Sequence, residues 1–167
     1  MELGFVGLGR MGGNMVERLL GGGHRVVAYN RSPEPVARAV AKGATGASSL
    51  KELVNALAPP RTVWVMVPAG PATEETVTAL AQLLASGDII IDGGNSYFKD
   101  DCRRADELRP RGIHYLDAGT SGGIWGLKNG YCLMIGGERA VYERLEPIFK
   151  ALAPADGYGW MGPHGAG

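Results

Sequence analysis

The sequence contains little cysteine and little histidine, and both are scattered. Its two cysteines, Cys102 and Cys132, are too few for a disulfide framework and have no CxxC spacing, which favours a reducing compartment. The histidines, at positions 24, 114 and 164, form no cluster with metal-ligand spacing. We therefore expect neither a disulfide scaffold nor a metal site.

The sequence also lacks an excess of either charge and lacks a long apolar run. Seventeen basic residues balance seventeen acidic ones, so a nucleic acid is not the expected partner. No apolar stretch approaches the roughly 18 residues of a membrane span, and residues 1–6 enter an apolar strand without a basic leader. These absences predict a cytoplasmic, soluble protein that has no membrane partner and acts on a small molecule.

Glycine, by contrast, is abundant. It accounts for 27 of the 167 residues, more than twice the average share of about 7%. The glycines show no three-residue period, which excludes collagen, and the 45% of hydrophobic residues excludes a disordered low-complexity chain. Glycine must therefore serve particular backbone positions, in a chain whose length suits one domain.

Strand-like and helix-like segments alternate along the chain. Apolar runs predict strands at 3–6, 25–29, 62–67, 88–91, 113–116 and 131–135. Helices are predicted at 11–20, 33–42, 49–57, 73–84 and 139–152, with a polar helix ending near 109 and a glycine-rich loop at 119–130. The alternation predicts an α/β fold, a Rossmann-like, doubly wound and mainly parallel sheet with helices on both faces.

A glycine turn follows the first predicted strand and opens the first predicted helix. Its residues, which form a GxGxxG pattern, are Gly7, Leu8, Gly9, Arg10, Met11 and Gly12. In this context the pattern is typical of a dinucleotide-binding turn. Gly7 permits the tight turn, Gly9 lets a pyrophosphate approach the positive end of the helix, and Gly12 lets the helix pack on the strand.

The end of the second predicted strand favours one dinucleotide over the other. NAD-binding domains place a carboxylate there for the ribose 2′-hydroxyl, whereas NADP-binding domains place a cation there for the 2′-phosphate. The residues here are Asn30, Arg31 and Ser32, and no residue between His24 and Pro33 is acidic. Because the Arg31 guanidinium can meet a phosphate, we predict NADP as the cofactor, with NAD as the alternative.

Three further loops follow predicted strands, at the sheet edge where open α/β sheets bind ligands. The segment 67–70 could present its backbone to the nicotinamide half of the cofactor. Paired glycines in the segments 92–96 and 117–123 let the backbone approach a ligand, and Asn95 offers both a donor and an acceptor. We interpret Asp92 and Asp117 as strand-end residues that form turns rather than as catalytic carboxylates.

Together these segments resemble the decarboxylating 6-phosphogluconate dehydrogenases over the whole chain. The resemblance is carried by Gly7–Gly12, Asn30–Ser32, Met66–Gly70, Asp92–Ser96, Thr120–Gly123 and Gly162–Gly167, and Trp125–Met134 is similar to the shorter bacterial branch. It implies metal-free oxidation of the C3 hydroxyl of 6-phosphogluconate by NADP, loss of carbon dioxide, and protonation of the enediol to ribulose 5-phosphate, a step of the pentose phosphate pathway.

The resemblance also implies a role for individual residues. The glycine turn and the segment 30–32 would hold the cofactor, and the residues along it would be Val67, Pro68 and Ala69. Asn95 would touch both nicotinamide and substrate, and the sugar acid would be bound by Ser121, Gly122 and Gly123. The family's proton-transfer lysine and its substrate-gripping pairs follow a Gly-Ala-Gly segment, so no catalytic residue is assigned within this chain.

The last residues define the expected domain boundary. Residues 1–161 are predicted to form the Rossmann domain, and 162–167 the start of a connector to a helical domain. The lysines of the chain have no motif around them and are interpreted as solvated: Lys42, Lys51, Lys99, Lys128 and Lys150. We therefore expect cofactor binding with little turnover, and a monomer even where the parent enzyme is a homo-oligomer.

Two other functions fit the same sequence. A 3-hydroxyacid dehydrogenase would share the glycine turn and the Ser-Gly-Gly loop, but such enzymes usually carry a Ser-Thr pair where this chain has Gly94-Asn95-Ser96. A stand-alone domain that senses NADP without chemistry is the second alternative. The sequence predicts no role for Lys128, and Trp125 could shield a substrate or face a partner.

Overall fold

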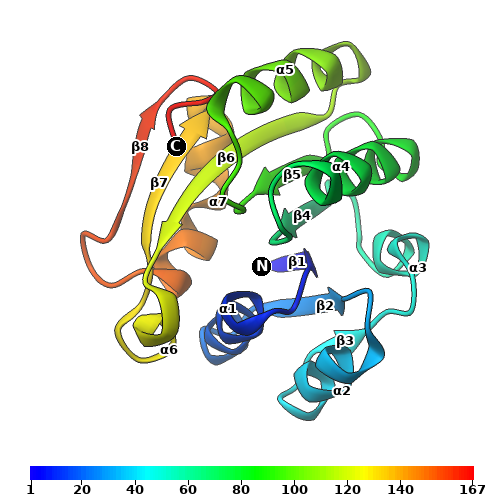
Figure 1. Ribbon diagram of the computed structural model, residues 1–167, viewed down its shortest axis with the longest axis vertical. Helices are drawn as coiled ribbons and strands as arrows, with labels where there is room; N and C mark the ends of the chain where they lie inside the picture. The colour runs from blue at the N-terminus through cyan, green and yellow to red at the C-terminus, as the bar shows by residue number, and fades with distance from the viewer.

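The eight strands of the chain form one sheet. The computed structural model describes residues 1–167, with the strands in the order β3-β2-β1-β4-β5-β6-β7-β8 (Figure 1). Their bounds are β1 Glu2–Val6, β2 Arg25–Tyr29, β3 Thr45–Gly46, β4 Thr62–Val65, β5 Ile89–Asp92, β6 His114–Ser121, β7 Cys132–Gly137 and β8 Tyr158–Gly162. Every pairing is parallel except that of β6 with β7, which confirms the mainly parallel sheet.

The order of the strands reverses at β1. From β1 the chain adds β2 and β3 on one side, and then returns to place β4 on the other side. In open α/β sheets this switch point opens a crevice between the loops that leave the two central strands. The fold therefore positions the loops after β1 and β4 beside a natural ligand site.

Helices cover both faces of the sheet, as predicted. Their bounds are α1 Arg10–Gly21, α2 Pro33–Ala41, α3 Leu50–Asn55, α4 Pro71–Leu83, α5 Phe98–Leu108, α6 Gly126–Asn129 and α7 Arg139–Leu152, with short 3₁₀ turns at Arg109–Arg111 and Gly123–Trp125. Figure 1 shows α3, α4 and α5 along one side of the sheet and α1 and α7 along the other. No helix combines the length and the apolarity that a membrane crossing requires.

Alternating side chains of the central strands divide the core into two layers. In β5, Ile89 and Ile91 pack with buried residues of α1 and α7, whereas Ile90 packs with those of α3, α4 and α5. In β4, Trp64 is fully buried in the first layer, as the sequence predicted. Strands buried on both faces are apolar along most of their length, as residues 63–65 and 89–91 are, which explains why β4 and β5 could be recognised from sequence.

The structure corrects several predicted boundaries. The predicted boundary between the strand 113–116 and the loop 119–130 was wrong, because β6 continues to Ser121, where it pairs with Cys132 of β7. Strand β4 ends at Val65, two residues earlier than predicted. The short strand β3 and the edge strand β8 were not predicted.

Candidate cofactor and substrate site

One row of paired residues marks the carboxyl edge of the sheet. Tyr29, Val6, Val65, Asp92 and Asp117 are register partners across the five adjacent strands β2, β1, β4, β5 and β6. The glycine turn and the loops that begin at residues 30, 66 and 93 leave directly from this row, while β6 runs on to Ser121 before its own loop begins. The fold therefore brings every segment predicted to bind a ligand to the same edge.

The three glycines of the first turn occupy different environments. Gly7 has a φ of 95°, and a Cβ there would lie 2.1 Å from the carbonyl oxygen of Met66. A Cβ at Gly12 would lie 2.0 Å from the carbonyl oxygen of Gly7, so helix and strand meet too closely for a side chain. Gly9, which precedes α1, has nothing within 4 Å of its Cβ position. The N-terminal end of α1 is therefore open to a ligand at Gly9.

Asn30 joins the glycine turn to the loop after β2. The backbone N–H of Leu8 donates to Oδ1 of Asn30 at 2.8 Å, and Nδ2 of Asn30 donates to the carbonyl oxygen of Ser32 at 3.3 Å. Arg31 and Ser32 are exposed, and Arg31 forms no ion pair within the chain. The structural bond of Asn30 to Leu8 was not predicted, because nothing in the sequence pairs residues 22 positions apart.

A hollow of about 540 Å³ lies at the switch point. Its lining comprises Val6, Gly7, Gly9, Tyr29, Asn30, Arg31, Leu50, Met66, Val67, Pro68, Ala72, Glu75, Thr76 and Ala79. Gly7, Gly9, Asn30, Arg31, Val67 and Pro68 among them are predicted cofactor residues, and they come from the loops after β1, β2 and β4. Glu75 contributes one carboxylate to this lining, whereas the open glycine at a helix N-terminus, the free guanidinium of Arg31 and the apolar walls suit a flat, anionic ligand.

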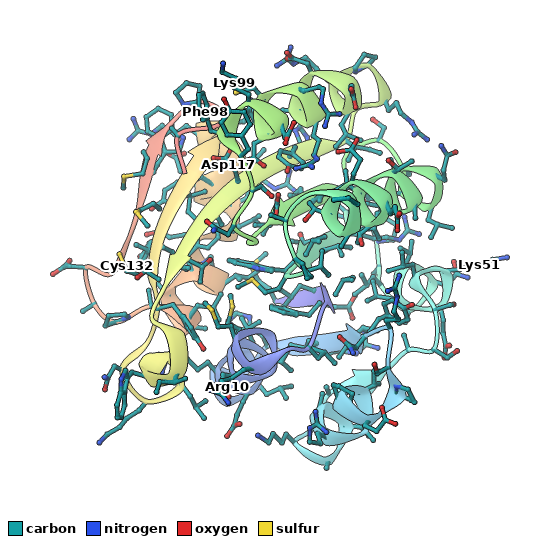
Figure 2. The ribbon with its side chains drawn as sticks, in the orientation of Figure 1. Arg10, Lys51, Phe98, Lys99, Asp117 and Cys132 are labelled. Carbon is teal, nitrogen blue, oxygen red and sulfur yellow. The ribbon has the colours of Figure 1, made fainter.

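A second hollow of about 360 Å³ adjoins the first between α1 and α2. Asn30 lines both hollows, and Arg10, Arg38 and Lys42 supply three cations to the second one. Lys42 pairs with Glu17, whereas Arg10 and Arg38 form no ion pair. Figure 2 labels Arg10 at the start of α1. No acidic side chain lines this second hollow, so it also favours an anion.

The loop after β5 is fixed by the last residue of that strand. Oδ1 of Asp92 accepts the backbone N–H of Gly94 at 2.9 Å, and Oδ2 accepts the hydroxyl of Ser96 at 2.5 Å. Asn95 lies between these two anchors and is exposed. Gly93 sits against the indole of Trp64, where a Cβ would lie 2.2 Å from Nε1. The interpretation of Asp92 as a turn-forming residue is thus confirmed.

The predicted substrate loop begins at the last residue of β6. Ser121 and Gly123 are exposed, and Gly122 and Gly123 have φ values of 154° and 50°. A Cβ at Gly122 would lie 2.9 Å from the ring of Tyr131. Because Asp92 and Asp117 are register partners, Ser121 and Asn95 both lie beyond the same row of the sheet. The structure therefore places the predicted substrate residues on one edge.

Asp117 departs from its predicted role. It lies inside β6 rather than at a strand end, and its carboxylate accepts the backbone N–H groups of Gly165 at 2.8 Å and Gly167 at 2.7 Å. Figure 2 places Asp117 below the start of α5, on the part of the sheet beside which the chain ends in Figure 1. Asp117 thus holds the segment 163–167 on the sheet.

A buried polar cluster beneath the loop 93–96 was not predicted. The Tyr115 hydroxyl lies 2.7 Å from Oδ1 of Asp101 and 3.1 Å from Oδ2 of Asp92, and Nε of Arg104 donates to Glu74 at 2.9 Å. Burial raises the pKa of Asp101 to about 7, against the hydrogen bond from Tyr115 and with the help of the Asp92 charge. The sequence signal was weak, because Asp101 and Arg104 belong to a helix that is polar on most of its surface.

All five lysines are exposed, which confirms their interpretation as solvated. Figure 2 shows Lys51 pointing away from the sheet and Lys99 at the outer surface near the start of α5. Cys102 and Cys132 are free thiols, with Cys132 exposed at the end of β7 that pairs with Ser121.

The chain matches a known protein family over nearly its whole length. The model of the family described as the NAD binding domain of 6-phosphogluconate dehydrogenase matches residues 2–162. The chain belongs to the 6-phosphogluconate dehydrogenase family. This confirms the resemblance drawn from the sequence motifs and makes the chain an NAD(P)-binding domain.

Relatives of the dehydrogenase family differ in the cofactor that their names give. The NAD-dependent decarboxylating 6-phosphogluconate dehydrogenase of Haloferax volcanii is 45% identical, covering 100% of this chain and 55% of that protein. The NADP-dependent decarboxylating enzyme of Bacillus subtilis is 40% identical, covering 99% of this chain and 37% of that protein. The chain thus spans about half the length, or less, of these relatives, and family membership alone does not decide the cofactor.

Solved structures of two dehydrogenases share the fold. The 6-phosphogluconate dehydrogenase of Plasmodium falciparum superposes with a TM-score of 0.90 at 31% identity, over 100% of this chain and 38% of that one. The 3-hydroxyisobutyrate dehydrogenase of Mycobacterium tuberculosis superposes with a TM-score of 0.91 at 27% identity, over 99% of this chain and 56% of that one. The fold alone therefore does not separate the two dehydrogenase classes.

Proposed function

We propose that this chain is the NADP-binding part of a decarboxylating 6-phosphogluconate dehydrogenase. The observation that carries this function is the row of register partners from β2 to β6, which puts the glycine turn and the predicted cofactor and substrate loops along one edge of the sheet, with the cofactor loops beside the switch point at β1. The family match supplies the reaction class. Neither would suffice by itself, because Rossmann sheets serve many substrates.

The cofactor would lie along the first hollow with its pyrophosphate at Gly9. Leu8, Arg10 and Met11 would contact it from the turn, and Val67, Pro68 and Ala69 would lie along its nicotinamide half. Asn30, Arg31 and Ser32 would surround the ribose 2′-phosphate, because the loop after β2 carries an unpaired cation and no carboxylate. Bound NADP would supply a hydride acceptor.

The substrate would lie between the loops after β5 and β6. Asn95, Ser121, Gly122 and Gly123 would donate and accept hydrogen bonds with the sugar acid while its C3 hydroxyl is oxidised. Loss of carbon dioxide and protonation of the enediol would then give ribulose 5-phosphate. We assign no proton-transfer residue within residues 1–167, so this chain alone should turn over about 10² to 10⁴ times more slowly.

A fluorescence titration of the chain with NADPH and NADH tests the cofactor. We expect NADPH to bind about ten- to a hundredfold more tightly, because one hydrogen bond to a charged phosphate is worth about 1.5–3 kcal/mol. Equal or tighter binding of NADH would contradict the assignment. Binding of neither dinucleotide would contradict the function as a whole.

The substrate is tested on the whole protein that contains this domain. We expect reduction of NADP with 6-phosphogluconate and no reduction with 3-hydroxyisobutyrate. The second substrate is included because the fold superposes equally well on a 3-hydroxyisobutyrate dehydrogenase. Activity with 3-hydroxyisobutyrate alone would indicate that the protein is a 3-hydroxyisobutyrate dehydrogenase. The absence of activity with both substrates would favour a domain that senses NADP without chemistry.

A further inference from the structure

The geometry of the buried cluster under the loop 93–96 constrains how many of its carboxyl groups can be ionised. The hydroxyl of Tyr115 is within hydrogen-bond distance of two carboxylates, Asp101 at 2.7 Å and Asp92 at 3.1 Å. A phenol has one hydrogen to donate. If both carboxylates were ionised, one of these contacts would join two acceptors with no hydrogen between them, inside a site where all three side chains are buried.

The shared proton belongs on Asp101 rather than on Asp92. The Asp92 carboxylate already accepts the N–H of Gly94 and the hydroxyl of Ser96, and Arg104 lies 3.5 Å from it, so its ionised form is well satisfied. Asp101 has only the Tyr115 hydroxyl as a hydrogen-bond partner and lies farther from Arg104, at 3.9 Å. A protonated Asp101 donates to Tyr115, which donates to Asp92, and every contact then contains one hydrogen.

The chain of hydrogen bonds ends at the two neighbours of Asn95, the residue predicted to touch the cofactor and the substrate. Gly94 and Ser96, the two groups bonded to Asp92, flank Asn95 on both sides. We propose that Asp101 and Tyr115 are positioning residues for Asn95. The proton held by Asp101 leaves the Tyr115 hydroxyl free to donate to Asp92, and Asp92 in turn holds the loop 93–96 in place. This inference rests on the function proposed above, because only that function gives Asn95 a ligand.

Titratable or charged groups face Asp101 from each of the elements packed against it. Asp92 lies on β5, Tyr115 and Asp117 on β6, and Arg104 on α5 beside Asp101 itself. Glu74 of α4 reaches the cluster through Arg104. Burial together with the Asp92 and Asp117 charges disfavours the ionised form of Asp101, and its pKa is raised to about 7. The hydrogen-bond chain should therefore loosen as the pH rises through neutrality.

Nuclear magnetic resonance of the chain without ligand tests the link directly. The amide signal of Gly94, whose N–H is bonded to Asp92, should shift with pH with a midpoint near 7. In Asp101→Asn the shift should vanish, because the side-chain amide donates to Tyr115 at every pH. Asp100→Asn is the matched control, since this neighbour on α5, whose side chain is 42% exposed and pairs with Arg103, should leave the titration unchanged. An unchanged Gly94 titration in Asp101→Asn would overturn the inference.

Binding of two ligands separates positioning from general stabilisation. NADPH contains the nicotinamide ring near Asn95, whereas 2′-phospho-ADP-ribose lacks it. We expect Tyr115→Phe to weaken NADPH about three- to tenfold at pH 6 and to leave 2′-phospho-ADP-ribose unchanged, the loss expected for about one hydrogen bond. Asp101→Asn should bind NADPH as the wild type does at pH 6 and should keep that affinity at pH 8, where the wild type weakens.

The outcomes distinguish this inference from the function on which it rests. Equal weakening of both ligands in a folded Tyr115→Phe would indicate a merely structural role and would overturn the inference. If that variant unfolds, the comparison of the wild type with Asp101→Asn at pH 6 and pH 8 decides, and parallel loss of NADPH affinity in both proteins refutes it. Failure of the wild type to bind either ligand would instead refute the proposed function.

Discussion

Three glycines of one turn carry different structural demands, although the GxGxxG pattern treats them alike. The Cβ position of Gly12 is filled by backbone, whereas that of Gly9 faces open space. Gly12→Ala should therefore destabilise the fold by about 1–3 kcal/mol, as overpacking does, and lower the melting temperature by several degrees. Gly9→Ala should cost less than about 1 kcal/mol, since its φ of −61° suits alanine.

Gly9→Ala, which should hardly destabilise the fold, should nevertheless weaken the binding of a dinucleotide. The methyl group of Gly9→Ala would occupy the open space at the end of α1, so NADPH affinity should fall about tenfold or more in a protein that melts normally. Calorimetry and a fluorescence titration on the same samples check both quantities. A Gly9→Ala protein that binds as tightly as the wild type would show that no ligand approaches this helix end.

Asn30 and Arg31 should both determine whether the chain binds NADPH more tightly than NADH. Asn30→Asp keeps the acceptor for the Leu8 N–H but places a negative charge beside the expected 2′-phosphate, so NADPH should weaken about tenfold or more while NADH is retained. Arg31→Ala should weaken NADPH to a similar degree. Lys51→Ala, which removes an exposed cation that lines none of the hollows, is the control and should change neither affinity.

Parallel fluorescence titrations of the three variants with both dinucleotides make the comparison. An equal loss of NADPH and NADH affinity in Arg31→Ala would show that Arg31 contacts a part common to both cofactors, rather than the 2′-phosphate. Loss of NADPH affinity in Lys51→Ala would show that the electrostatic field of distant cations contributes more to NADPH affinity than direct contact with the phosphate does.

At the scale of elements, sequence patterns identified what is local. The strands β1, β2, β4 and β5 each contain a continuous apolar run, and the helices after them carry amphipathic stripes or caps, so both could be predicted. Strand β3 has two residues, and β8 has the sequence Tyr-Gly-Trp-Met-Gly, in which glycine hides the pattern. The extension of β6 to Ser121 depends on its antiparallel pairing with β7, which no local pattern contains.

The candidate site shows the same division. The glycine turn could be predicted because its pattern is encoded in adjacent residues. The ties between Asp92 and Tyr115, and between Asp117 and Gly167, join segments 23 and 50 positions apart. Only the folded sheet brings such groups together, and so the interior support of the site could not be predicted.

The segment 163–167 is an element whose position depends on one carboxylate. Asp117 accepts hydrogen bonds from two backbone N–H groups, and Asp117→Asn would turn one acceptor into a donor that faces an N–H. The loss should be about 1–3 kcal/mol, confined to this segment and its contact with Cys102.

Hydrogen exchange and thiol labelling measure that loss. Amides of residues 164–167 should exchange faster in Asp117→Asn, and Cys102, whose thiol donates to the carbonyl of His164, should react faster with an alkylating reagent. The exposed Cys132 serves as the internal control and should react at an unchanged rate. Uniformly faster exchange along the chain would indicate global destabilisation instead.

At the scale of the whole molecule, a net charge of zero conceals an uneven distribution of charge. Many of the basic side chains are paired with carboxylates on neighbouring elements, as Arg104 is with Glu74. Arg10, Arg31 and Arg38 form no ion pair, and all three line hollows that also contain Asn30. The composition excluded a nucleic-acid surface, but it did not exclude a local site for a smaller anion.

The stability of the whole fold should depend on pH through two carboxyl groups with opposite signs. The hydrogen bond from Arg103 lowers the pKa of Glu74 from 4.5 to about 2, so its contribution is present above pH 4.5 and is lost as the pH falls toward 2. Burial raises the pKa of Asp101 from 3.8 to about 7. Between these values the folded chain keeps a proton that the unfolded chain has released, so stability falls as the pH rises from about 4 to about 7.

Melting curves of the wild type and Asp101→Asn between pH 4 and pH 8 isolate the second group. The variant has no proton to lose, so its melting temperature relative to the wild type should rise across this interval and become constant above about pH 7.5. Asp100→Asn, at a partly exposed neighbour on the same helix, should show no such trend. A difference that stays constant from pH 4 to pH 8 would mean that Asp101 is ionised in the folded chain, and that Tyr115 lies between two charged carboxylates.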